Sequence, residues 1–165
     1  MKKINKNAVG LATNLVHAGE PPDPLTGALA PVLVRTKTFR QPEFGKESKW
    51  QYSRGKNPTR SILETKLSAL FGKGTATVFG SGDAATAMFL LSLKPGDHII
   101  CCEELYGGTI RLLDQLFKDF GIKTTYLDVH SESAIKKAVT PETKIIWVEN
   151  PTNPRLGIMI SWAEP

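Results

Sequence analysis

A glycine turn at Gly80-Ser81-Gly82 separates a run rich in β-branched residues from a helical pattern of small residues. A turn of this kind leaves backbone N–H groups exposed at the start of a helix, where they and the helix dipole attract anions such as phosphate. Asp83 falls in the first turn of that helix. The Asp83 carboxylate suits the dipole but would repel a phosphate, and we therefore expect its side chain to point elsewhere.

The turn is compatible with two kinds of phosphate ligand. The spacing Gly80-x-Gly82-x-x-Ala85 matches the fingerprint of dinucleotide-binding proteins, and Glu103 lies where an acid could bind a ribose. The alternative is a single phosphate monoester held by the same N–H groups. A turn that only packs is a third interpretation, and the turn alone does not separate the three.

A second candidate phosphate group precedes the turn in the segment YSRGKNPTR, residues 52–60. One residue separates Tyr52 from Arg54, so an extended segment would direct both side chains to the same side. A phenol hydroxyl and a guanidinium together bind phosphate well. A dinucleotide site has no need of this segment.

Two later segments offer groups for a flat ring and for polar contacts. In ELYGGTIR, residues 104–111, two glycines follow Tyr106 and leave room for a ring to stack on it. In VENPTNPRLG, residues 148–157, two prolines stiffen the loop that holds Asn153. A partly buried aromatic and a turn residue are the ordinary alternatives. The common placement of these segments favours one shared site.

The elements that must position these groups predict an α/β sheet. Four strand-like runs, at 75–79, 98–102, 123–128 and 144–149, alternate with helical patterns near 83–93, 109–120 and 131–139. This alternation predicts right-handed crossovers and a mainly parallel sheet covered by helices. The first of these helices is apolar nearly all round, which predicts deep burial. Ligands of such sheets bind beyond the carboxyl ends of the strands, where the candidate segments after the strands fall.

Residues 1–57 are rich in proline turns and predict an extended N-terminal arm, followed by a domain over residues 58–165. That domain should begin with a helix over residues 59–71 that stops at Gly72.

Cys101 and Cys102 are expected to be buried thiols, and no metal site is expected because no CxxC spacing exists.

The chain has 165 residues and a net charge of +5 that is spread along it without a block, which argues against a nucleic-acid partner. No apolar run reaches the ~20 residues of a membrane span, and the start has no signal-peptide pattern. We expect a cytoplasmic protein without membrane contact.

Taken together, the segments YSR-x-x-NPTR, FGSGDAA, YGGT-x-R and ENPTNP resemble the Cys/Met-metabolism family of pyridoxal-phosphate (PLP) enzymes, the cystathionine γ-synthase and γ-lyase group. The resemblance outweighs the dinucleotide interpretation. It implies the α/β fold of the aspartate-aminotransferase type (fold type I), with pyridoxal 5′-phosphate as cofactor. It also implies elimination or replacement reactions on sulfur amino acids or activated homoserine.

The resemblance implies roles for matching positions. Tyr52 and Arg54 would reach the cofactor phosphate of a neighbouring subunit in a dimer or tetramer, onto which the N-terminal arm packs. The N–H groups of Gly82 and Asp83 would hold the same phosphate. Tyr106 would stack on the pyridine ring and assist proton transfer. Asn153 would contact the cofactor hydroxyl or the substrate carboxylate.

Two of the chain's departures from the family pattern bear on the expected site. Asp83 stands where the family commonly has an apolar residue. The family's acidic partner of the pyridinium nitrogen, its Schiff-base lysine and its carboxylate-binding arginine come later in sequence and cannot be placed here. We therefore expect residues 58–165 to be the first part of the large domain and the 165-residue chain to lack turnover. A non-catalytic remnant that oligomerises is the alternative function.

Overall fold

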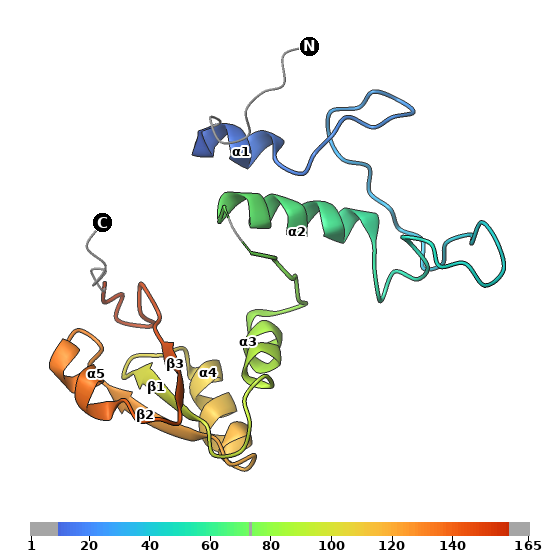
Figure 1. Ribbon diagram of the computed structural model, residues 1–165. Coiled ribbons are helices and arrows are strands. Elements are labelled where there is room, and N and C mark those ends of the chain that lie inside the picture. Colours follow the sequence, from blue (N-terminus) through green and yellow to red (C-terminus); the bar gives the residue numbers. More distant parts are fainter. Residues whose placement is uncertain (1–9, 73, 159–165) are drawn as a thin grey trace. The chain divides into compact units, whose positions relative to one another are not determined.

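The computed structural model describes residues 10–72 and 74–158 (Figure 1). The chain divides into two compact units after Val78, and each is described by itself. The predicted domain boundary after residue 57 stays a prediction. The outer ends of the predicted arm and domain, residues 1–9 and 159–165, lie outside the described residues. No helix in the described ranges is long and apolar enough to cross a membrane.

The first unit is built on two helices, α1 (Leu11–His17) and α2 (Pro58–Leu70). The Asn57 side chain caps α2 by accepting a hydrogen bond from the Thr59 N–H at 2.9 Å, and Pro58 occupies the first helical position, which its fixed φ favours. Gly72 follows the helix with φ +73°, so the predicted stop is confirmed. The sequence predicts an extended arm over these residues, and the structure adds one short helix, α1, to it.

The segment that carries Tyr52 and Arg54 is fixed by a short antiparallel pairing. Thr38 and Tyr52 form an isolated bridge, and the N–H of Ser53 donates to the carbonyl of Lys37 at 2.8 Å. The rings of Phe39 and Trp50 lie 6.4 Å apart beside it. These contacts hold the chain immediately before Arg54.

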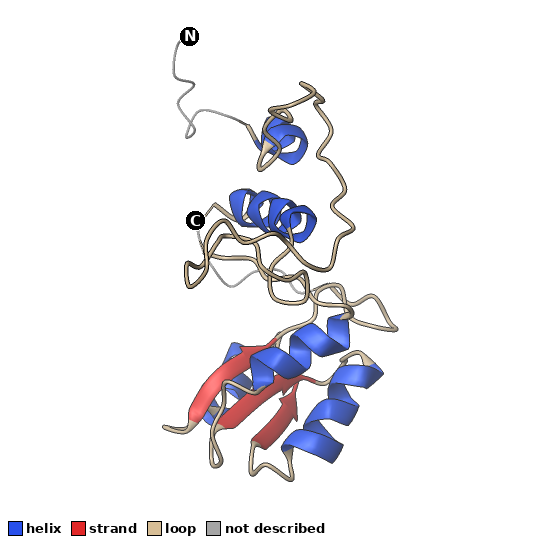
Figure 2. Cartoon of the chain, turned by 90° about the vertical axis from the view of Figure 1, so that its right-hand side faces the viewer, coloured by secondary structure: helices blue, strands red, loops and turns tan. Residues whose placement is uncertain are grey.

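The second unit contains a three-stranded parallel sheet (Figure 2). Its strands are β1 (His98–Cys102), β2 (Lys123–Leu127) and β3 (Thr143–Trp147), in the order β2-β1-β3. The connection from β1 leads to β2 at one edge of the sheet, and the connection from β2 leads back past β1 to β3 at the other edge. Because these two connections run in opposite directions, right-handed crossovers place their helices on opposite faces of the sheet. The predicted parallel α/β organisation is confirmed.

The predicted strand at 75–79 is wrong, since no strand is formed in this described segment. Side chains of α2 bind its backbone instead. The Ala76 N–H donates to Ser68 Oγ at 2.8 Å, and the Val78 N–H donates to Glu64 Oε1 at 3.3 Å. Donors that already have side-chain acceptors do not need a neighbouring strand.

Three helical segments accompany the sheet. They are α3 (Gly82–Leu90), α4 (Gly107–Arg111), which continues into the π-helix η2 (Leu112–Phe117), and α5 (Glu132–Ala138). The expected deep burial of the first is wrong: of the α3 residues only Leu90 is buried, whereas Met88 and Phe89 are exposed. The sheet has no strand at 75–79 for these side chains to pack against.

The core of the second unit surrounds β1, which is buried along its whole length. Cys101 and Cys102 are buried thiols, as predicted, and burial raises the pKa of Cys101 to about 12. At the amino end of β1, the His98 ring lies between the hydroxyls of Thr143 and Thr125, at 2.8 and 2.9 Å. The central strand is thus fixed to both neighbours.

Candidate functional site

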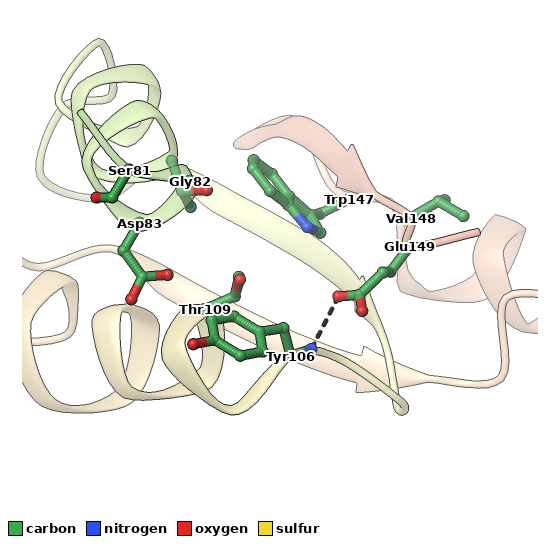
Figure 3. Close-up of a pocket in the computed structure, with 9 residues that line it drawn as sticks. Ser81, Gly82, Asp83, Tyr106, Thr109, Trp147, Val148 and Glu149 are labelled. Atoms are coloured by element: carbon green, nitrogen blue, oxygen red, sulfur yellow. Dashed lines mark hydrogen bonds between the residues drawn. The ribbon is translucent and has the colours of Figure 1, made fainter. Parts of the chain in front are cut away.

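A cavity of about 500 Å³ opens at the carboxyl edge of the sheet (Figure 3). Three segments far apart in sequence form it: the start of α3, the start of α4 and the end of β3. Its lining residues are Ser81, Gly82, Asp83, Thr86, Tyr106, Thr109, Trp147, Val148 and Glu149. The sequence-based expectation that a ligand site lies at this edge agrees with the position of the cavity.

The start of α3 borders this cavity with residues whose backbone N–H groups lie in the first helical turn. Ser81 is the N-cap: its Oγ accepts from the N–H of Ala84 at 3.1 Å, and its carbonyl accepts from the N–H of Ala85 at 3.2 Å. The N–H groups of Gly82 and Asp83 precede these two and have no acceptor within a regular helix. They can therefore bind an anionic oxygen in the cavity.

The start of α4 places Tyr106 beside the cavity. The backbone N–H of Tyr106 donates to Glu149 Oε2 at 2.8 Å, which ties the loop after β1 to the end of β3. Figure 3 shows the ring of Tyr106 along the cavity, with Trp147 across from it. The Trp147 ring is in turn held by Phe89 of α3, with ring centroids 6.0 Å apart.

Asp83 does not turn away from the cavity, so the expectation for its side chain is wrong. Figure 3 shows its carboxylate directed toward the start of α4, where Thr109 and Tyr106 lie. It can approach so closely because residue 108 is a glycine. A Cβ at Gly108 would lie 2.4 Å from Tyr106 Cε1 and 2.6 Å from Asp83 Oδ1.

The contact at Gly108 gives a first prediction. Gly108→Ala should displace the ring of Tyr106 and the Asp83 carboxylate, and overpacking of this kind costs about 1–3 kcal/mol. Gly107→Ala is the matched control, because a Cβ there meets nothing nearer than Arg111 Nη1 at 3.7 Å and alanine favours a helix. Urea unfolding and the near-ultraviolet circular dichroism of the aromatic residues measure both effects. Equal behaviour of the two variants would contradict the packing argument.

The electrostatics of the cavity are acidic. The lining residues include the carboxylates of Asp83 and Glu149, and none of these described residues is a lysine or an arginine. A bound phosphate would find backbone donors here but no cationic side chain. A guanidinium or ammonium partner would have to come from elsewhere.

Tyr52 and Arg54 lie in the first unit, whereas the cavity belongs to the second. The Arg54 guanidinium carbon lies 4.9 Å from the centroid of the Tyr52 ring, a cation–π contact, so the two side chains point the same way as expected. The segment is a turn rather than extended, with the N–H groups of Gly55 and Lys56 donating to the Tyr52 carbonyl at 3.0 Å.

Asn153 is exposed on the loop after β3 and is not among the residues that line the cavity. Glu104 anchors this loop: its two carboxylate oxygens accept from the Thr152 hydroxyl at 2.8 Å and from Arg155 at 2.9 Å. The Thr152 hydroxyl also accepts from the N–H of Gly157 at 2.8 Å. The loop with Asn153 is therefore tied to the loop that carries Tyr106.

The structure thus brings together Gly82, Asp83 and Tyr106 among the predicted site residues. Sequence reasoning did not assign Trp147, Glu149 or Thr109 to the site. Alternation along a strand could have indicated Trp147 and Glu149, since residues two apart at a strand end face the same side.

The chain is similar to known proteins over most of its length. Residues 12–160 match the family described as "Cys/Met metabolism PLP-dependent enzyme". The chain is 41% identical over 149 residues to a probable cystathionine γ-synthase of Herpetosiphon aurantiacus, covering 90% of this chain and 47% of that protein. It is 42% identical over 149 residues to cystathionine γ-lyase of Bos taurus, covering 90% of this chain and 37% of that protein.

A solved structure shows the same likeness. Cystathionine γ-lyase from Lactobacillus plantarum, complexed with L-serine, superposes with a TM-score of 0.84 at 39% identity, covering 91% of this chain and 39% of that one. The chain therefore spans less than half the length of these relatives. The expected aspartate-aminotransferase-type α/β fold is confirmed, and the dinucleotide interpretation is not supported.

Proposed function

This chain belongs to the Cys/Met metabolism family of PLP-dependent enzymes, and from that membership we propose that its cavity holds the phosphate and one ring face of pyridoxal 5′-phosphate. The observation that carries the proposal is the meeting of the Gly82 and Asp83 N–H groups with the Tyr106 ring around one cavity of about 500 Å³. Backbone donors at a helix start suit a phosphate, and an aromatic face suits a pyridine ring.

The residues present fit this cofactor. The N–H groups of Gly82 and Asp83 would bind phosphate oxygens, and the Tyr106 ring would stack on the pyridine. Glu149 positions Tyr106 by accepting its backbone N–H, and Trp147 lines the cavity across from the Tyr106 ring. Tyr52 and Arg54 would supply the hydroxyl and the positive charge that the cavity lacks. Asn153 would contact the cofactor hydroxyl or the substrate carboxylate.

When bound, the cofactor supplies an electron sink that stabilises negative charge on the carbon atoms of an amino acid. The residues of this chain would bind and orient the cofactor. Tyr106 and Trp147 would flank the ring, and the Tyr106 hydroxyl could hold or move a proton beside it. The helix dipole of α3 would stabilise the charge of a bound phosphate.

For the whole protein we propose transsulfuration chemistry of the cystathionine γ-synthase and γ-lyase kind, namely elimination or replacement on sulfur amino acids or activated homoserine. Its substrates would be small amino acids. We further propose a dimer or tetramer in which Tyr52 and Arg54 reach the cofactor of a neighbouring subunit. The similarity to a probable cystathionine γ-synthase and to a cystathionine γ-lyase supports the proposed chemistry. The acidic lining of the cavity supports the proposed oligomer, because a cation for the phosphate would have to come from residues outside this lining.

The test is to titrate the chain with pyridoxal 5′-phosphate and to follow its absorbance and the protein fluorescence before and after borohydride reduction. We expect saturable, reversible binding, and no specific lysine labelled by reduction, because no lysine lines the cavity in the described residues. Stabilisation by NADH but not by pyridoxal phosphate would contradict the proposal.

A further inference from the structure

The side chain of Asp83 is the starting point, because it places a negative charge where the proposed phosphate would bind. Its carboxylate borders the cavity that Gly82 also lines (Figure 3). A carboxylate lies within roughly 4 Å of the backbone nitrogen of its own residue. An oxygen bound to that N–H therefore lies within roughly 7 Å of the carboxylate.

The charge of Asp83 has no cationic partner among the described residues that line the cavity. Glu149, the second carboxylate there, accepts the backbone N–H of Tyr106 at 2.8 Å and carries the same sign. The position of Asp83 is set by its neighbours, since Gly108 leaves the space that its oxygens use. The carboxylate therefore lies close to the proposed phosphate position.

We propose that Asp83 is an affinity-determining residue that weakens the binding of phosphate esters in this cavity. The inference rests on the proposed function, because it takes the start of α3 as the phosphate site. Because Asp83 repels the phosphate, a phosphate ester binds tightly only when a cation from outside the cavity lining compensates the carboxylate charge. Without such a cation, Asp83 lowers the affinity for phosphorylated ligands relative to unphosphorylated ones. A neutral residue of the same shape would remove this discrimination.

The expected size follows from Coulomb's law. A dianionic phosphate and a carboxylate about 6 Å apart in a water-like dielectric repel each other enough to reduce affinity about tenfold, and ordinary salt reduces this to about fourfold. Asp83 also has a favourable effect in the free protein, since an acidic residue in the first turn stabilises a helix. The Asp83→Asn change should therefore trade a small loss of stability for tighter phosphate binding.

The experiment measures dissociation constants of pyridoxine 5′-phosphate and of pyridoxine by calorimetry, at low and at high salt. Neither compound carries the aldehyde, so neither labels surface lysines. The proteins are the full chain, Asp83→Asn and the control Asp119→Asn. Asp119 is an exposed residue of the same unit, follows η2 and does not line the cavity, and its substitution makes the same change in net charge.

We expect Asp83→Asn to bind pyridoxine 5′-phosphate about four- to tenfold more tightly than the unchanged chain, with a smaller gain at high salt. Its affinity for pyridoxine and both affinities of Asp119→Asn should stay unchanged. Equal affinities of the unchanged chain and Asp83→Asn for the phosphate ester would overturn the inference and leave the proposed function intact. Failure of both proteins to bind either compound would overturn both proposals.

Discussion

Ile100→Ala should lower the free energy of unfolding of the second unit by about 2–5 kcal/mol, the usual range for truncating a fully buried isoleucine. Ile100 lies in the middle of β1, between β2 and β3, and its exposed fraction is 0%. The substitution leaves a cavity in a strand that is enclosed on both sides. Urea unfolding followed by far-ultraviolet circular dichroism measures the loss.

Ile146→Ala is the matched control, because Ile146 on β3 is the register partner of Ile100 but is 48% exposed. Both substitutions remove the same atoms and the same β-branched side chain from neighbouring strands. The difference between them therefore reports burial alone, and the Ile146 change should cost less than about 1 kcal/mol. Similar losses for the two variants would mean that β1 is not the centre of the core.

The sequence predicted those parts of the fold in which local pattern and tertiary packing agree. β1, β2 and β3 alternate with helices at the expected spacing, and Gly72 follows the end of α2 as expected. The helical pattern expected near 131–139 forms α5, whose N-cap Ser131 accepts the Ala134 N–H with its Oγ. The segment 75–79 has the composition of a strand but forms no hydrogen-bonded ladder with a neighbouring strand. Ser68 and Glu64 bind its N–H groups, and composition carries no information about such competing acceptors.

The candidate site could be predicted only as far as topology determines it. Tyr106 follows from the rule that loops beyond the carboxyl ends of parallel strands meet. Gly82 lines the same cavity although the strand expected before it, at 75–79, is not formed. The orientation of Asp83 depends on the space at Gly108, which is a property of packing between two helix starts. The exposure of Asn153 depends likewise on how Glu104 fixes Thr152 and Arg155, a contact across about fifty residues of sequence.

Arg54→Ala should weaken the binding of pyridoxal 5′-phosphate about tenfold to a hundredfold, the value of one or two charge-assisted hydrogen bonds. The reason is the composition of the cavity, whose described lining residues offer backbone donors and two carboxylates but no cation. Arg54→Lys should restore part of the loss, since it keeps the charge but not the forked geometry. Arg40→Ala is the control, because Arg40 is an exposed arginine of the same unit. Fluorescence titration measures each affinity.

Mixing two defective chains tests whether Arg54 acts on a neighbouring subunit. Arg54→Ala keeps an intact cavity, and Gly108→Ala keeps an intact Arg54 but an obstructed ring site. If Arg54 serves the cavity of a partner, co-refolded mixtures contain sites that combine the two intact halves, and a tight-binding fraction returns that neither variant shows alone. If Arg54 serves the cavity of its own chain, every site in the mixture keeps one defect and the titration is the sum of the two. Because a loss of affinity in Arg54→Ala is expected in either case, it is the mixture that distinguishes a shared site from one completed within a single chain.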